Sequence, residues 1–341
     1  MGRLSFTDAS DPRYALAFIN SGDLVSSVTI GGSLRSTDFG PGDSFVIGCS
    51  FHDTRGTALG VFGSNKLYAD SNVFYSVLDQ GIRIEGSGHN LRKNLLVYQS
   101  GISGTSLDDN RGFLDISGCS DSPLMVSNVV AGASTFSMSS MSLTCADNGI
   151  TWTDNVLHSS QIGYFQLGSS PTATSCVVVS GIRIYSMNTF SIYTNSEISM
   201  EIKDVMLFDN PGGIYTYVSG PNGRTHERSY KYVKISNSLI VGNTGMQLCG
   251  QTANPATRRQ NMPISRSPLG GNLGILLPNF MSGQNMPDMA LTGWSSENAL
   301  DGQTIIQARF FNFTHIVSKL IMIRSMISVI SYEVQIGHFL K

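Results

Sequence analysis

Short runs of alternating apolar and polar residues recur along the chain, whereas helical periodicity is almost absent. Each run follows an Asn or another small residue, as in Ser71-Asn72-Val73-Phe74 and Lys93-Asn94-Leu95-Leu96. Alternation over a few residues is typical of β-strands, because successive side chains point to opposite faces. The pattern therefore predicts a protein built from many short strands.

The small residues before these runs recur at a regular spacing. Successive gaps are 23, 22, 34, 27, 26, 23 and 33 residues, and the short gaps cluster at 22 to 23. Such a period indicates a solenoid, since roughly 22 residues hold three strands of ~5 residues and three bends. We predict an all-β fold, a right-handed parallel β-helix with at least seven coils. The spaced positions form a predicted structural ladder: Cys49, Asn72, Asn94, Asn128, Asn155, Gly181, Asp204 and Asn237.

Asn suits this ladder because of its side-chain amide. When coils stack about 4.8 Å apart, the amide can donate to one neighbouring copy and accept from the other. Asn also tolerates the left-handed conformation of a sharp bend. Five of the eight positions are Asn, and Cys, Gly and Asp interrupt the row. The ladder should therefore contribute less than an unbroken stack.

Changes in composition divide the chain into four predicted regions. Residues 1–44 suggest an N-terminal cap with a loop insertion, and residues 45–250 the β-helix repeats. Residues 251–315, which contain several Pro and Gly, are expected to form an extended loop and a final coil or cap. Residues 316–341 lack the Gly and Asn punctuation and are expected to lie outside the packed solenoid.

Composition and charge narrow the classes of function. Charged residues make up 13% of the chain and the formal net charge is −2, so the basic patch of a nucleic-acid binder is not expected. No apolar stretch is long enough to predict a transmembrane helix. The first 11 residues lack the apolar core of a signal peptide.

The five cysteines follow no zinc-binding spacing. We expect Cys49 to be a buried small hydrophobe, because it falls in a ladder position. Cys119 can bridge to Cys145, and Cys176 to Cys249, but the spacing does not choose a pairing.

Several stretches resemble the fibrocystin and fibrocystin-like proteins of the polycystic kidney and hepatic disease family. They include Asp11-Pro12-Arg13-Tyr14-Ala15-Leu16, Gly48-Cys49-Ser50-Phe51-His52-Asp53, Gly81-Ile82-Arg83-Ile84-Glu85-Gly86 and Ser236-Asn237-Ser238-Leu239-Ile240-Val241-Gly242. The resemblance covers about residues 7–315. It implies the parallel β-helix (PbH1) repeats of a large, receptor-like membrane glycoprotein, whose other domains and membrane span lie outside this chain.

Residues with candidate chemistry are few. The chain has no nucleophile elbow, phosphate-binding loop or zinc-protease motif. The best polar cluster joins His52, Asp53 and Arg55 to Arg83 and Glu85 one coil further on, and stacking is expected to bring them to one face. The simpler interpretation is a solvated turn with local hydrogen bonds. The alternative is a polysaccharide-cleaving enzyme, because acid–base pairs break glycosidic bonds and the resemblance extends to β-helices of cell-surface hyaluronidases.

A repeated tetrapeptide raises a further question. Gly81-Ile82-Arg83-Ile84 and Gly181-Ile182-Arg183-Ile184 have the same sequence. Alternation puts both Ile in the core and the Arg outside. The two Arg would then form a cationic binding row or, more simply, two separate solvated side chains.

We therefore expect a non-catalytic extracellular module that binds a protein or glycan ligand or acts as a spacer. No catalytic residue, metal or cofactor is expected, and nucleic acid is not an expected partner. The expected location is the extracellular face of the plasma membrane or cilium, reached through other parts of the parent protein. Asn312, in Asn312-Phe313-Thr314, is the one predicted glycosylation site.

Overall fold

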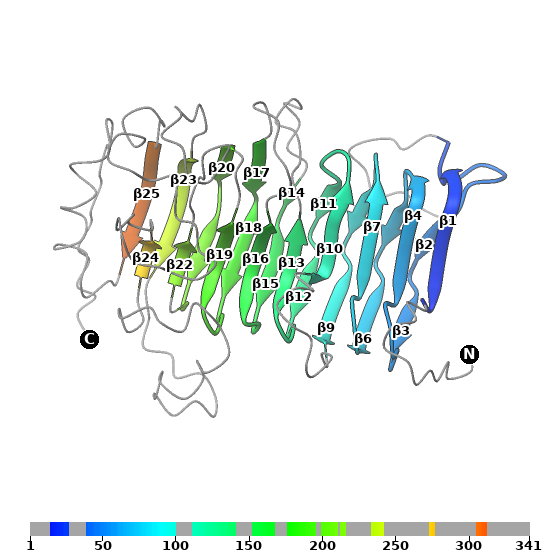
Figure 1. The fold of residues 1–341 in the computed structure, drawn as a ribbon, viewed down its shortest axis with the longest axis horizontal. Coiled ribbons are helices and arrows are strands. Elements are labelled where there is room, and N and C mark those ends of the chain that lie inside the picture. Colours follow the sequence, from blue (N-terminus) through cyan, green and yellow to red (C-terminus); the bar gives the residue numbers. More distant parts are fainter. Residues whose placement is uncertain are drawn as a thin grey trace, which may run out of the picture.

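The computed structural model describes residues 14–26, 39–99, 111–140, 152–167, 176–195, 199–210, 212–215, 233–241, 273–276 and 305–311. Within these ranges the chain forms 25 β-strands and no helix. The strands stack side by side along one long axis (Figure 1). The predicted tail at residues 316–341 and the predicted glycosylation site Asn312 lie outside the described residues.

The strands form three sheets, here called A, B and C. Within each sheet, every pair of neighbouring strands is parallel. Sheet A contains β1 (Leu16–Asp23), β4 (Leu59–Asn65), β7 (Ile82–Gly86), β10 (Gly112–Cys119), β13 (Phe136–Ser140), β16 (Ile162–Leu167), β19 (Phe190–Asn195), β22 (Gly212–Tyr215) and β24 (Leu273–Leu276). Sheet B contains β2 (Phe45–Ile47), β5 (Tyr68–Asp70), β8 (Asn90–Arg92), β11 (Leu124–Val126) and β14 (Trp152–Thr153).

Sheet C has 11 strands. Its main row contains β3 (Ser50–His52), β6 (Val73–Val77), β9 (Leu95–Gln99), β12 (Val129–Ala131), β15 (Asn155–His158), β18 (Ile182–Tyr185) and β21 (Met206–Phe208). The long strand β23 (Val233–Val241) pairs with β21 through one half and with β20 (Ser199–Lys203) through the other. Two further strands complete the sheet, β17 (Cys176–Ser180) beside β20 and β25 (Ile305–Phe311) beside β23.

This architecture confirms the predicted parallel β-helix. The chain visits the sheets in turn, and each strand pairs with its equivalent in the next coil, as Leu59 of β4 does with Ile82 of β7. Sheet A alone has nine stacked strands, in agreement with the expected minimum of seven coils. The right hand of the coil, which is usual for parallel crossovers, stays a prediction. The parallel ladder begins at Leu16 in β1, so the solenoid extends further toward the N-terminus than the predicted start at residue 45.

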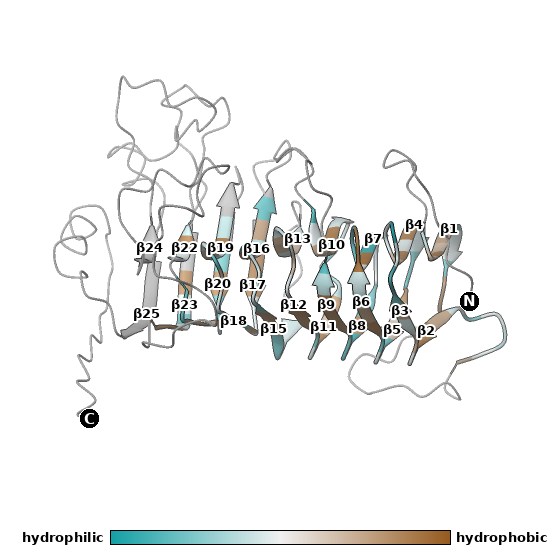
Figure 2. Cartoon of the chain, turned by 90° about the horizontal axis from the view of Figure 1, so that it is seen from below, coloured by the Kyte–Doolittle hydropathy of each residue, from teal (hydrophilic) through white to brown (hydrophobic). Residues whose placement is uncertain are grey.

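The core is a column of apolar side chains between the sheets. Sheet C contributes one inward row, in which Phe74, Leu96 and Val130 follow one another in register, each completely buried. Hydrophobic segments recur from coil to coil on the strands (Figure 2). Burying one side chain of this size contributes about 1.5–3 kcal/mol, so each coil is held mainly by the residues that it stacks on its neighbours.

A ladder of amides connects the coils at the bend between sheets B and C. The Nδ2 of Asn94 donates to Asn128 Oδ1 (3.0 Å) and to the carbonyl oxygen of Ala69 (3.0 Å). The Oδ1 of Asn94 accepts from the Nδ2 of Asn72 at 2.9 Å. The Asn128 amide repeats the arrangement with Asn155 at 3.0 Å. Because these amides are nearly inaccessible to solvent, every one of their hydrogen bonds replaces one to water.

The structure corrects the last three ladder positions. Asn155 pairs with Ile182, and the next ladder positions are Val205 and Ser238, because Arg183 pairs with Met206 and Met206 with Leu239. The residues that the spacing suggested lie one place earlier, at the bend itself, with φ angles of 58°, 54° and 45°: Gly181, Asp204 and Asn237. Gly, Asp and Asn are the residues that adopt this left-handed conformation most readily. The sequence signal there therefore marked the bend and not the ladder.

The first ladder position also differs from expectation. The backbone N–H of Cys49 donates to Asn72 Oδ1 at 2.9 Å, so its main chain does occupy the ladder. Its side chain is exposed, whereas a buried one was expected. The left-handed conformation is carried by the preceding residue, Gly48 here and Ser71 in the next coil, and not by the ladder residue.

We predict that Asn94→Ala will lower the free energy of unfolding by about 1–3 kcal/mol, because it leaves buried groups of Asn72 and Ala69 without their partner. Asn237→Gly is the matched control: that residue is exposed, its left-handed conformation suits Gly, and it loses only a surface hydrogen bond, from Asn237 Nδ2 to Asp204 Oδ1. Urea denaturation of both variants measures the difference. Equal losses in the two variants would contradict the ladder.

A second prediction concerns acid stability. His89 is buried, with Nδ1 accepting from the backbone N–H of Leu67 (3.1 Å) and Nε2 donating to the carbonyl oxygen of Glu85 (3.1 Å). Burial lowers the pKa of His89 to about 4, so the unfolded chain, with a His pKa of about 6.5, takes up the proton first as the pH falls. The contribution of His89 to the free energy of unfolding is therefore complete above pH 6.5, the pKa in the unfolded chain. It falls by roughly 3 kcal/mol as the pH drops from 6.5 to 4.

Unfolding measured from pH 7.5 to 4 tests this expectation. His89→Gln should lower stability at pH 7.5 and flatten its decline toward pH 4. The control His52→Gln changes an exposed side chain and should leave the profile as in the original chain. A His89→Gln profile parallel to that of the original chain would show that another group causes the loss.

Candidate functional site

The predicted polar cluster is divided between two sheets. His52 ends β3 in sheet C, where its Nδ1 lies 3.2 Å from Asp53 Oδ2 and both side chains are exposed. Arg55 follows in the exposed bend. Arg83 and Glu85 lie on β7 in sheet A. The expected common face is therefore not formed, because a coil carries the chain from one sheet to another between these residues.

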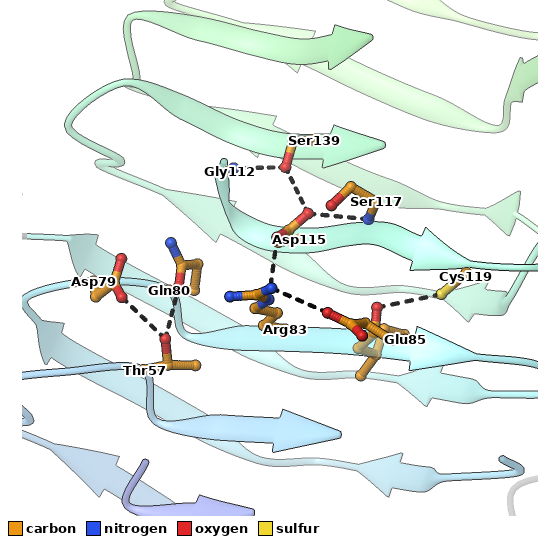
Figure 3. A network of polar contacts seen from close by, with 11 residues as sticks. Thr57, Asp79, Gln80, Arg83, Glu85, Gly112, Asp115, Ser117, Cys119 and Ser139 are labelled. Atoms are coloured by element: carbon orange, nitrogen blue, oxygen red, sulfur yellow. Dashed lines mark hydrogen bonds and ion pairs between the residues drawn. The ribbon is translucent and has the colours of Figure 1, made fainter. Parts of the chain in front are cut away.

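Arg83 is the centre of a polar network on sheet A (Figure 3). Its Nη2 donates to Glu85 Oε1 at 3.0 Å, and its Nε lies 3.9 Å from Asp115 Oδ2. The guanidinium also lies over the ring of Phe62, 5.0 Å from the ring centre. Such a cation held by two carboxylates and one aromatic face has its charge largely neutralised within the protein.

Asp115 was not recognised in the sequence, although it carries the most buried carboxylate of this network. Its side chain is 1% exposed. Oδ1 accepts from the backbone N–H of Ser117 and from Ser139 Oγ, both at 3.0 Å, and Ser139 Oγ accepts from the N–H of Gly112 at 2.6 Å. Oδ2 has no hydrogen-bond donor within the described residues. The available signal was an Asp inside the apolar run Phe113-Leu114-Asp115-Ile116.

A second group of polar contacts lies beside this network. Thr57 Oγ1 is within hydrogen-bond distance of Gln80 Oε1 (2.7 Å) and Asp79 Oδ2 (3.1 Å), and these residues precede β7 (Figure 3). These bonds join two successive coils through side chains. These hydrogen bonds fix the segment just before β7 and thereby the position of Arg83.

The repeated tetrapeptides do not form a cationic row. Arg83 belongs to sheet A, whereas Arg183 belongs to β18 in sheet C. Arg183 Nη2 donates to Asp154 Oδ1 at 2.9 Å, and both side chains are about half exposed. The same tetrapeptide thus occurs in two different sheets. Its alternation places Ile on the inner face and Arg on the outer face of sheet A and of sheet C alike.

The outer face of sheet C carries most of the exposed apolar side chains. Among the described residues, six large hydrophobic side chains are exposed, and only Ile19 lies away from this sheet. The other five project from β6, β9 and β21: Val73, Tyr75, Leu95, Tyr98 and Met206. Further along the same face, His158 stacks on Tyr185 (ring centroids 4.8 Å) and Tyr185 on Phe208 (4.9 Å). Partial burial lowers the pKa of His158.

Other predicted features have simple outcomes. Cys119 has a free, buried thiol that donates to the carbonyl oxygen of Ile84 at 3.6 Å, so the bridge to Cys145 is not formed. Burial raises the pKa of this thiol.

In the described part of the chain, no three His, Cys, Asp or Glu side chains gather as metal ligands. No helix with the length and hydropathy of a membrane span occurs among these residues either.

Comparison with known proteins identifies relatives along most of the chain. It is 30% identical to fibrocystin-L of Mus musculus over 322 residues, which cover 88% of this chain. It is 29% identical to fibrocystin-L of Homo sapiens over 341 residues (93% of this chain) and 26% identical to fibrocystin of Canis lupus familiaris over 255 residues (71%). No protein-family model and no solved structure matches the chain.

These relatives are much longer than the chain. It spans 7% of the length of fibrocystin-L and 6% of the length of fibrocystin. The resemblance noted in the residues is confirmed, and the chain is a homologue of a short segment of fibrocystin-L and fibrocystin.

Proposed function

We propose that the chain is a β-helical, extracellular region of a receptor-like cell-surface protein, and that it binds a ligand without catalysing a reaction. The observation that carries this proposal is the similarity to fibrocystin-L over 88% of the chain. A stiff stack of coils suits such a region, because it displays side chains at fixed intervals along flat sheets. The ligand is a glycan or a protein.

The arrangement of the polar residues supports a role without catalysis. General acid–base catalysis needs a titrating group that can reach a bound substrate in a preorganised site that excludes water. Arg83 and Glu85 bind each other at 3.0 Å, and Asp115 is held by Ser117 and Ser139. His52 and Asp53 are 66% and 57% exposed on an open bend. Local pairing and open solvent both suit a structural role for these groups.

A glycan-cleaving enzyme is the second candidate, and one observation favours it. Asp115 places a buried carboxylate next to Arg83 and Glu85 on the outer face of sheet A. Two carboxylates and a cation are a group of residues from which glycosidic-bond cleavage can be built. A turnover assay separates this candidate from a binding region.

We predict that the purified chain will leave hyaluronan at its original size. The assay incubates the polymer at several pH values, with and without calcium, and measures its length by size-exclusion chromatography with light scattering. The physical reason is that Arg83 and Glu85 bind each other, whereas His52 and Asp53 lie on an exposed bend. Depolymerisation that disappears in Asp53→Ala, Arg83→Ala or Asp115→Asn would establish the enzyme instead.

A glycan array and a pull-down from cell-surface extracts separate ligand binding from a spacer role. Reproducible binding that saturates with concentration supports the proposal. An absence of any saturable ligand in both assays would leave stiffness and length as the function of the solenoid.

A further inference from the structure

The outer face of sheet C carries a long, narrow strip of apolar side chains. The strip is defined by the outward residues of β6, β9, β12, β15, β18 and β21, which pair in register from coil to coil. One row begins at Val73 and Leu95 and ends at Met206. The other row begins at Tyr75 and ends at Phe208.

Aromatic rings lie toward both ends of this strip. At one end, the ring of Tyr75 is 6.4 Å from that of Tyr98, and the two side chains are 51% and 53% exposed. At the other end, His158, Tyr185 and Phe208 form a continuous stack with interplanar angles of 3° and 10°. Tyrosine exposes an apolar ring with a polar hydroxyl, which suits a partner that has both apolar and hydroxyl surfaces.

Tyr98 lies at the bend that leaves sheet C, where the repeated coil imposes a backbone conformation that is unfavourable for a bulky residue. Its φ is 62°, in the left-handed region, which costs a bulky residue about 1–2 kcal/mol. The equivalent bends of other coils carry Ser76, Gly132 and Ser159, which are small residues. A strained conformation that leaves half of an aromatic side chain in solvent indicates a functional reason for the ring.

Polar groups border the strip on both sides. One margin is the bend between sheets B and C, with Ser71, Asp154 and Asp204. The other is the bend that leaves sheet C, with Asp53, Ser159 and Ser186. All six are at least partly exposed. Hydroxyl and carboxylate oxygens along an aromatic strip are hydrogen-bond partners for sugar hydroxyls, while the rings cover the apolar faces of the sugar.

The dimensions of the strip favour a linear ligand over a protein surface. Six strands about 4.8 Å apart make it roughly 25 Å long, and two rows of side chains make it about 7 Å wide. A stable protein interface needs about 800 Å² on each partner, several times this area. A single polysaccharide chain has the width of the strip, and its sugar units repeat at a distance close to the spacing of the coils.

The charges favour an uncharged glycan. Arg183 is the one Lys or Arg that projects from the strip strands at their paired outward positions, and its guanidinium is bound to Asp154 at 2.9 Å. The bends at the two margins carry four carboxylates, Asp53, Asp154, Asp204 and Asp209, against one ammonium group, that of Lys93. Acidic margins repel an anionic polymer such as hyaluronan and accept hydrogen bonds from neutral sugars.

We propose that the outer strip of sheet C binds a linear, uncharged polysaccharide laid along the axis of the solenoid. The sugar rings stack on the exposed rings of Tyr75 and Tyr98 at one end. At the other end they pass over the outer edges of His158, Tyr185 and Phe208, whose ring faces cover one another. Their hydroxyls bind the polar margins. This inference rests on the proposed ligand-binding function and names the class of ligand and the surface that receives it.

The test is isothermal titration of the full chain with neutral, linear hexasaccharides of glucose, mannose and N-acetylglucosamine, with a hyaluronan hexasaccharide as the anionic comparison. At least one neutral probe should bind more tightly than hyaluronan. Tyr75→Ala and Phe208→Ala should each weaken its binding about fivefold, the effect of losing one aromatic contact. Ile19→Ala, which changes an exposed side chain of sheet A, should leave the affinity unchanged.

Tyr98→Asn keeps the proposal testable if an alanine variant fails to fold. Asn adopts the left-handed conformation readily, so the melting temperature should hold or rise while glycan affinity falls about fivefold. A stable Tyr98→Asn variant with unchanged affinity for the neutral probe would overturn the proposal.

Other outcomes also decide the matter. Failure of every neutral probe to bind would overturn the proposal, as would dimerisation that Tyr75→Ala abolishes in sedimentation velocity. A failure of the proposed function gives a different result from a failure of the strip proposal. Cleavage of hyaluronan would contradict the non-catalytic role without affecting this surface, whereas neutral-glycan binding that survives in the strip variants would refute the strip and keep the ligand-binding function.

Discussion

The bend between sheets B and C depends on one repeated interaction, the hydrogen bond from the amide of one ladder Asn to the carbonyl group of the next. Asn72, Asn94, Asn128 and Asn155 form this row at distances of 2.9 to 3.0 Å. Each amide also binds a backbone carbonyl in the preceding coil, as Asn94 binds Ala69. Because the ladder amides are buried, these contacts satisfy polar groups that would otherwise lose hydrogen bonds to water. Together with the backbone N–H of Cys49, they link the bends of five successive coils.

The separate sheets of this stack give the molecule two different outer faces. On sheet A, Arg83, Glu85 and Asp115 neutralise one another in a partly buried network. On sheet C, the outward side chains are mainly apolar and aromatic and remain accessible. A stack of parallel strands repeats each face at a fixed interval, so small differences in one position of the coil become a continuous surface. The similarity to fibrocystin-L covers 88% of the chain.

The acid sensitivity that we predict for the fold comes from one buried side chain, His89. His89 connects the turn before β8 to the backbone of Leu67 and Glu85 through both ring nitrogens. One nitrogen must accept a hydrogen bond, so the folded chain requires a neutral ring. The pKa of about 4 follows from this burial. We therefore expect this single side chain to couple the stacking of two coils to pH.

The sequence by itself determined the fold class and the bends. A spacing of 22 to 23 residues and alternating apolar positions are enough to predict stacked coils, because each coil must bury the same face in the same column. The ladder up to Asn155 could be found in this way. Its continuation through Ile182, Val205 and Ser238 could not, because local preference for a left-handed bend made Gly181, Asp204 and Asn237 stand out. Only the tertiary structure assigned residues to sheets: it separated His52 from Arg83, joined Arg83 to Asp115, and gathered Tyr75, Tyr98, Tyr185 and Phe208 on one face. Insertions of varying length change the spacing between these residues, whereas the register of the parallel hydrogen bonds decides which of them become neighbours.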